Sequence, residues 1–340
     1  MKALVLFFVL AISAASAVPI VVADGESGAV AVADRGQLSV HDAASGVLRF
    51  RVPIELSPTS GVAGHGEILL LDAIANRGLI LDLASRRSRR FDTAETPVDA
   101  VAFGNGFLIL ARDSSSLTLE HLNANSRTVQ VAPQSTLLET SRGNAFTYSP
   151  SSGEINSFDS DLRALARGKA QRGASDLEVA GNYLYLVFPK RGRIDAHDRR
   201  TLLMREHFSG GAVPLDLLAS GDPNVLGAGT LTIADPSSKR IWREEGSQSE
   251  IEAFSRGVLR GMLGLGLYNA KSTEIPTGVD RLFRSARVVW AYDTTTRTLY
   301  RTTTKKITKA AANIDHRAIA PDGRGGVWIV SDGERLRRVQ

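Results

Sequence analysis

Five aspartates recur at one position of a repeated apolar segment, and this pattern points more directly to chemistry than any other in the sequence. They are Asp99 in PVDAV, Asp176 in ASDLE, Asp216 in PLDLL, Asp280 in GVDRL and Asp315 in NIDHR. Hard cations prefer several carboxylate and carbonyl oxygens as ligands. Carboxylates held close together have raised pKa values unless a cation neutralises them. If the five side chains form one ring, we expect it to bind a divalent cation or a cationic group.

A structural role explains the same pattern. Each aspartate could accept backbone N–H bonds and so hold the turn that leads into its strand. Two further copies of the segment carry Ser60 and Leu137 at this position. Repetition favours the structural role, because a structural need recurs in every copy whereas a binding site usually does not.

The aspartates belong to a larger unit that is repeated about every forty residues. Its most regular part is an alternating apolar run, and the eight copies are AVAVAD, EILLLD, FLILAR, AFTYS, YLYLVF, TLTIAD, VVWAYD and VWIVSD. Alternation and β-branched or aromatic residues indicate strands rather than helices. One strand precedes each run, and a third strand, a turn and a fourth strand follow it. We expect large side chains of the runs, such as Phe107, Trp290 and Trp328, to form the core.

Four strands in about forty residues are typical of a β-propeller blade. We therefore predict an all-β propeller of four-stranded blades, eight by count with seven as the alternative, forming one domain over residues 18–340. The first strand of each blade lines the central channel of such a fold, so the five aspartates are predicted at its mouth. The last copy ends after its third strand, and the N-terminal segment PIVVAD is a candidate for the missing fourth one.

One long insertion interrupts the repeat at about residues 249–278. Its apolar residues Ile251, Phe254, Val258, Met262 and Leu265 have helical spacing. We predict a partly helical insertion that covers the propeller itself. The alternatives are a lid over the channel, a docking helix for a partner and a contact with a membrane surface. The residues of a partner site would be Phe254, Arg256, Val258, Arg260 and Met262.

The N-terminal residues resemble a cleavable export signal. Lys2 precedes the apolar stretch ALVLFFVLAISAASA, and Ala15-Ser16-Ala17 fits a small-x-small cleavage site. We predict a signal peptide over residues 1–17 and a periplasmic or secreted mature chain that begins at Val18. A membrane anchor is the alternative, but the apolar part is short and contains Ser13. No later segment is apolar enough to cross a bilayer.

The remaining composition excludes several function classes. The chain of 340 residues contains no Cys, so it has neither disulfides nor thiolate metal ligands. Its 41 basic and 36 acidic side chains are interspersed and give a net charge of only +5, which does not indicate a nucleic-acid partner. The six histidines lack helical zinc-site spacing, and neither a nucleophile elbow nor a phosphate-binding glycine loop is present.

The runs AVAVADRGQLSVHD and TLTIADPSSKRIW resemble the strand–Asp–turn–strand repeats of the extracytoplasmic NHL, YVTN and SMP-30/gluconolactonase-like propellers. The resemblance covers nearly the whole mature chain. It implies the propeller fold and binding on one face of the ring. The SMP-30-like lactonases use carboxylate and Asn oxygens around a divalent metal, but no ligand set can be matched residue by residue.

Two functions follow from these observations. The first, which we favour, is a monomeric, non-enzymatic propeller without a cofactor that binds a protein or glycan partner through its channel face and insertion. The second is a metal-dependent hydrolase or lactonase whose aspartate ring holds a divalent cation.

Overall fold

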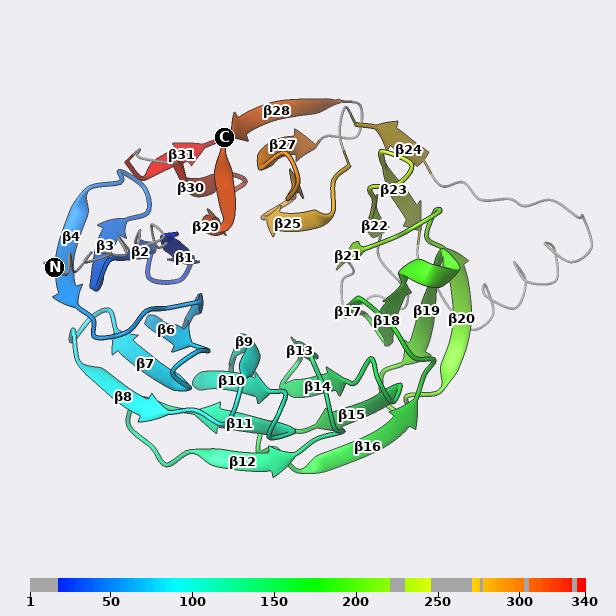
Figure 1. Cartoon of the computed structure of the whole chain (residues 1–340), viewed down its shortest axis with the longest axis horizontal. Helices are drawn as coiled ribbons and strands as arrows, with labels where there is room; N and C mark the ends of the chain where they lie inside the picture. The colour runs from blue at the N-terminus through cyan, green and yellow to red at the C-terminus, as the bar shows by residue number, and fades with distance from the viewer. Residues whose placement is uncertain (1–17, 221–229, 246–270, 276–277, 303–305, 332–334) are drawn as a thin grey trace, which may run out of the picture.

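The computed structural model describes residues 18–220, 230–245, 271–275, 278–302, 306–331 and 335–340. Eight antiparallel sheets follow one another around a central axis, as Figure 1 shows in a view down that axis. Each sheet is one blade, and its first strand is the innermost one. The predicted propeller and the count of eight blades are therefore confirmed.

The first four blades have four strands each. Blade 1 contains β1 (Ile20–Asp24), β2 (Ala29–Asp34), β3 (Gln37–Asp42) and β4 (Leu48–Pro53). Blade 2 contains β5 (Ser60–Gly64), β6 (Glu67–Asp72), β7 (Arg77–Asp82) and β8 (Ser88–Asp92). Blade 3 contains β9 (Pro97–Phe103), β10 (Gly106–Ala111), β11 (Ser116–Glu120) and β12 (Arg127–Gln130). Blade 4 contains β13 (Leu137–Ser141), β14 (Asn144–Tyr148), β15 (Glu154–Phe158) and β16 (Ala164–Lys169).

The next three blades repeat this plan. Blade 5 contains β17 (Asp176–Ala180), β18 (Tyr183–Phe188), β19 (Arg193–Asp198) and β20 (Met204–Ser209). Blade 6 contains β21 (Asp216–Ser220), β22 (Thr230–Asp235), β23 (Arg240–Glu245) and β24 (Lys271–Glu274). Blade 7 contains β25 (Arg281–Ser285), β26 (Val288–Asp293), β27 (Thr298–Thr302) and β28 (Ile307–Ala312). In its described residues blade 8 has three strands, β29 (Ile314–Pro321), β30 (Val327–Ser331) and β31 (Arg337–Val339).

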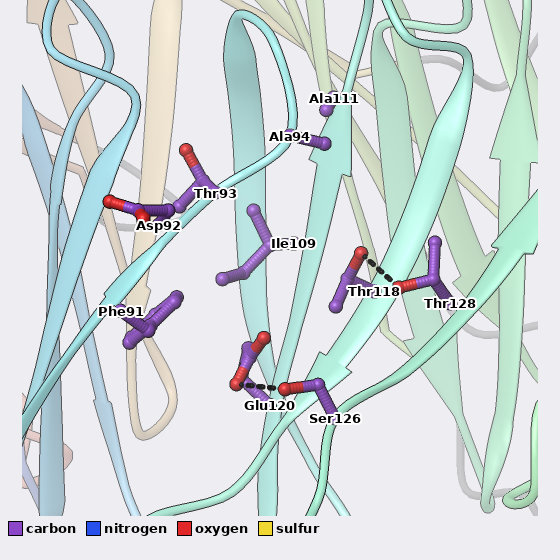
Figure 2. Close-up of a pocket in the computed structure, with 10 residues that line it drawn as sticks. All are labelled: Phe91, Asp92, Thr93, Ala94, Ile109, Ala111, Thr118, Glu120, Ser126 and Thr128. Carbon is purple, nitrogen blue, oxygen red and sulfur yellow. Dashed lines mark hydrogen bonds between the residues drawn. The ribbon is translucent and has the colours of Figure 1, made fainter.

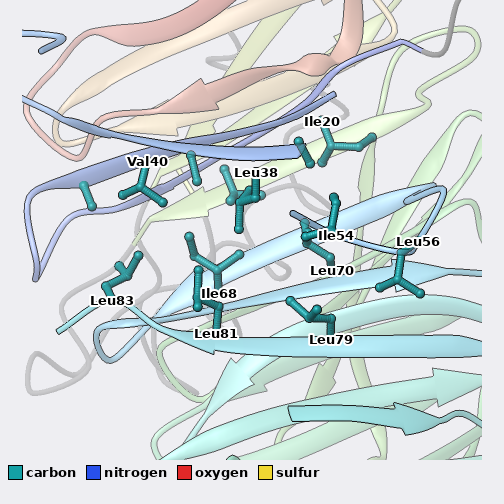
Figure 3. Packing of buried hydrophobic residues seen from close by; sticks show 14 residues of the cluster. Ile20, Leu38, Val40, Ile54, Leu56, Ile68, Leu70, Leu79, Leu81 and Leu83 are labelled. Atoms are coloured by element: carbon teal, nitrogen blue, oxygen red, sulfur yellow. The ribbon is translucent and has the colours of Figure 1, made fainter. Parts of the chain in front are cut away.

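The second strand of each blade is buried on both faces because a neighbouring blade covers each face. All six residues of β10 are buried, for example. Figure 3 shows the packing between blades 1 and 2, where Leu38 and Val40 meet Ile68, Leu70 and Leu81. The predicted core aromatics are confirmed: Phe107, Trp290 and Trp328 are at most 3% exposed. Burial of this apolar surface between blades is the main stabilising contribution to a stacked-repeat fold.

The recurring aspartate at the end of the second strand has a local structural role. Asp72 Oδ1 accepts the N–H groups of Ile74 and Ala75, and its Oδ2 accepts the Ser57 N–H from the loop entering the same blade. Asp235 likewise accepts N–H groups from Ala212 and Val213 in the loop entering blade 6. In blades 2 and 6 this aspartate therefore fastens the entry loop to its blade.

The ring closes differently from the sequence-based prediction. The segment IVVAD forms β1, which pairs with β2 as the innermost strand of blade 1, so it does not supply a fourth strand to blade 8. Each innermost strand instead contacts the next one around the axis, including β29 with β1. Val21 and Val30 of blade 1 pack in one cluster with Trp328 of blade 8. Closure thus depends on side-chain packing between whole blades rather than on a shared sheet.

The long insertion joins the two outer strands of blade 6. Residues 246–270, where the helix is predicted, lie outside the described residues. The predicted boundary at 278 is wrong, because Lys271–Glu274 form β24, which pairs with β23. Helical structure in the described ranges consists of the short 3-10 turn η1 (Pro189–Arg191). Those ranges hold no helix of a length and apolarity sufficient to cross a membrane.

Candidate functional site at the axis of the propeller

Three of the five predicted aspartates form equivalent links between adjacent blades. Asp99 lies on β9, where its Oδ1 accepts the Ala100 N–H at 2.9 Å. Its Oδ2 accepts the Leu138 N–H from the innermost strand of blade 4 at 3.2 Å. One carboxyl group therefore joins the innermost strands of two blades at the axis.

Asp176 and Asp216 repeat this arrangement in blades 5 and 6. Asp176 accepts the Leu177 N–H of its own strand and the Leu217 N–H of blade 6, both at 2.8 Å. Asp216 accepts the same Leu217 N–H at 3.0 Å and the Leu282 N–H of blade 7 at 2.5 Å. Both carboxyl groups thus accept from the same Leu217 N–H and lie close together, and burial raises the pKa of each. The structural interpretation of the repeated aspartates thus has direct support at these three positions.

The other two aspartates are not equivalent, which corrects the predicted five-membered ring. In the register of blade 7, Arg281 stands opposite Tyr292, and Asp280 precedes it by one residue. Because side chains alternate between the faces of a strand, a slip of one residue changes the face. Asp280 instead accepts the N–H and hydroxyl of Thr294. Asp315 lies at an irregularity of β29 and accepts three hydrogen bonds from Arg317 on the same strand.

Two glutamates that the sequence analysis did not select lie beside the three linking aspartates. Glu139 follows Leu137 by two positions on β13, and Glu178 follows Asp176 by two positions on β17. Residues two apart on a strand share a face, so strand alternation was the signal that could have identified them. We call Asp99, Glu139, Asp176, Glu178 and Asp216 the axial acid cluster.

Burial makes the acids of this cluster hard to ionise. It raises the pKa of Asp99 to about 7 and that of Glu139 to about 7. Burial, together with the negative charges of Glu139 and Asp176, raises the pKa of Glu178 well above its usual value. Burial and the charge of Asp176 do the same for Asp216. At neutral pH the cluster therefore retains protons, which reduces the repulsion among its members.

Positive charge faces the cluster from blade 7. Burial raises the pKa of both Asp176 and Glu178. The charge of Arg281 partly offsets this rise at Asp176, and the charge of Arg284 does so at Glu178. Within the described ranges, three or more His, Asp or Glu side chains are nowhere arranged so that they could hold a metal ion. The geometry supports hydrogen bonding between blades and proton retention by the cluster.

The second predicted site lies outside the described residues. Phe254, Arg256, Val258, Arg260 and Met262 fall within residues 246–270, so the partner site on the insertion stays a prediction. The described structure gives only its attachment points, at the ends of β23 and β24.

Comparison with known proteins supports the fold class alone. No family model matches the chain, and no curated protein matches it in sequence. The computationally designed Ika8 protein is similar in structure, with a TM-score of 0.65 and 10% identity over 92% of this chain and 93% of that one.

Two natural proteins are also similar in structure. Hsv2 of Kluyveromyces lactis has a TM-score of 0.58 and 10% identity, over 95% of this chain and 98% of that one. BamB from Moraxella catarrhalis has a TM-score of 0.58 and 13% identity, over 80% and 79%. At these identities the likeness supports the β-propeller fold alone, and the eight blades follow from the eight sheets of this chain. The NHL, YVTN or SMP-30-like type stays a prediction.

Proposed function

We propose that the chain is an exported, non-enzymatic propeller that binds a protein or glycan partner. The observation that carries this proposal is the use of Asp99, Asp176 and Asp216 as links between blades. Carboxyl oxygens that already accept backbone N–H bonds have fewer lone pairs left to bind a cation. The acids at the axis thus act mainly in holding the ring together, and binding is assigned to the rest of the surface and to the insertion.

The competing function is a metal-dependent hydrolase, and the axial acid cluster is the observation in its favour. Elemental analysis and thermal denaturation with added Ca²⁺, Mg²⁺, Mn²⁺ or Zn²⁺ separate the two functions. Our proposal expects no bound metal and no rise of the melting temperature. A cation-dependent rise that is lost in the double variant Asp176→Asn/Asp216→Asn would overturn it and assign the cluster to metal binding.

The role of the insertion is tested by deleting residues 251–270. Arg243 of β23 and Lys271 of β24 are paired, so a short linker can join the remaining ends. We expect the deletion to abolish partner capture from an envelope extract while the circular dichroism spectrum is retained. Shortening the 221–229 connection between the paired strands β21 and β22 is the matched control. Undiminished capture by the 251–270 deletion would exclude the insertion as the partner site.

Export is tested on the natural product. We expect N-terminal sequencing of the protein from the producing cells to begin at Val18. A chain that retains residues 1–17 in a membrane fraction would favour the anchor instead.

A further inference from the structure

A cavity of about 240 Å³ lies between blades 2 and 3, away from the axis. Figure 2 shows its walls: β8 and the linker that follows it on one side, and β10, β11 and β12 on the other. A water molecule accounts for roughly 30 Å³ of liquid water, so the cavity is larger than the voids that single waters fill. It has room for a six-membered ring.

The cavity combines an apolar wall with a row of hydroxyl groups. Ile109 is 3% exposed and pairs with Thr118, which pairs with Thr128 on the next strand. Paired residues share a face, so this row crosses three strands of blade 3. The Thr118 and Thr128 hydroxyls are hydrogen-bonded to each other at 3.0 Å. Phe91 completes the apolar wall from the side of blade 2.

A buried carboxylate with one unused oxygen lies at the end of this row. The Glu120 side chain is 5% exposed, and its Oε2 accepts hydrogen bonds from Arg89 and from Ser126. Its Oε1 accepts none from the described residues, and Figure 2 shows it turned toward Ile109 and Thr118. The cavity therefore offers a hydrogen-bonding atom that its own walls do not use.

The charges around the cavity indicate the charge of the ligand that it can bind. Arg89 pairs with Glu120, so the buried carboxylate is already neutralised. The other carboxylate of the lining, Asp92, is exposed, and water and salt screen its charge. Among the described residues the lining contains no Lys, Arg or His, so an anionic ligand would find no counter-charge. Hydroxyl donors and acceptors beside an apolar wall match a neutral ring that bears hydroxyl groups on its edge and C–H groups on its faces.

We propose that this cavity binds one neutral sugar residue, with sugar hydroxyls donating to Glu120 Oε1 and bonding to the Thr118 and Thr128 hydroxyls. The assignment rests on the proposed binding function and selects a glycan as its ligand. Ile109 and Phe91 would contact the apolar part of the ring.

Saturation-transfer NMR on the purified chain tests this assignment, with glucose, galactose, mannose and N-acetylglucosamine as probes and glucuronate as the anionic comparison. We expect saturation of at least one neutral sugar at about millimolar affinity. Thr118→Val keeps the side-chain shape and should weaken binding about fivefold to tenfold, as the loss of one hydrogen bond would. Ala94→Trp, placed on the cavity wall, should abolish binding. Thr308→Val, at an exposed position on the outer strand of blade 7, is the matched control and should leave binding unchanged.

Three results would overturn the assignment: no saturation of any neutral sugar, equal binding by the wild type and both cavity variants, or preference for glucuronate. A chain that captures a protein partner but saturates no sugar would overturn this assignment and leave the proposed function standing. Metal-dependent hydrolysis would overturn the proposed function. The effect of Thr118→Val on sugar binding would still show whether this cavity is the sugar site.

Discussion

Replacing Asp99 by Asn should change how the stability of the propeller depends on pH. The pKa of the ordinary aspartate is 3.8, and burial raises that of Asp99 to about 7. Between these two values the folded chain holds a proton that the unfolded chain has released. The free energy of unfolding therefore falls as the pH rises from about 4 to about 7, and this contribution is constant above that range.

The size of the effect follows from the shift. About three pKa units correspond to an upper limit of about 4 kcal/mol. Asp99 is half-buried at the axis, so water screens its charge and we expect about 1–2 kcal/mol. Asn cannot ionise, so Asp99→Asn should remove this part of the pH dependence. It also replaces one acceptor oxygen with an amide group, which should cost about 1 kcal/mol at every pH.

The measurement is urea denaturation of the wild type and Asp99→Asn, followed by tryptophan fluorescence between about pH 5 and pH 8. We expect the variant to be less stable than the wild type at the acid end and about equal to it at the alkaline end. Asp161→Asn, at an exposed turn position, is the control. Its free energy of unfolding should depend on pH in the same way as that of the wild type. If the curve of Asp99→Asn is also parallel to that of the wild type, the burial argument is wrong.

Three further substitutions test the links between blades and the turns. Arg338→Ala leaves the buried Asp322 carboxylate without its cation and should cost about 3 kcal/mol, seen as a lower melting temperature that Arg338→Lys partly restores. Although burial opposes ionisation, hydrogen bonds from two neighbouring serines hold the pKa of Asp235 at about 2. Its stabilisation is thus present above its unfolded value of 3.8 and lost as the pH falls toward 2, so Asp235→Ala should flatten the acid limb of a denaturation profile. A Cβ on residue 78 would lie 2.2 Å from the Phe91 ring, so Gly78→Ala should destabilise by about 1–3 kcal/mol in urea, and an unchanged midpoint would show that the ring moves freely.

The amino-acid sequence by itself determined the blades. Alternation of apolar residues is a local property of a strand, so runs such as FLILAR and VVWAYD indicated strands, turns and core without knowledge of any contact. The repeat length then predicted the propeller, and the number of copies predicted eight blades with seven as the alternative. The repetition of the aspartates also predicted that they have a structural role. The structure supports this role at Asp99, Asp176 and Asp216.

Tertiary structure decided the features that depend on register and on distant neighbours. The displacement of Asp280 by one residue is set by the pairing of β25 with β26. Alignment of the sequence repeats does not determine this strand register. The path of β1 was decided by its pairing with β2, because the segment IVVAD would read as a strand in either blade. Arg89 and Glu120 are 31 residues apart and meet only because two blades stack. Strand periodicity is a property of neighbouring residues, whereas register, ring closure and cavities result from the packing of whole blades.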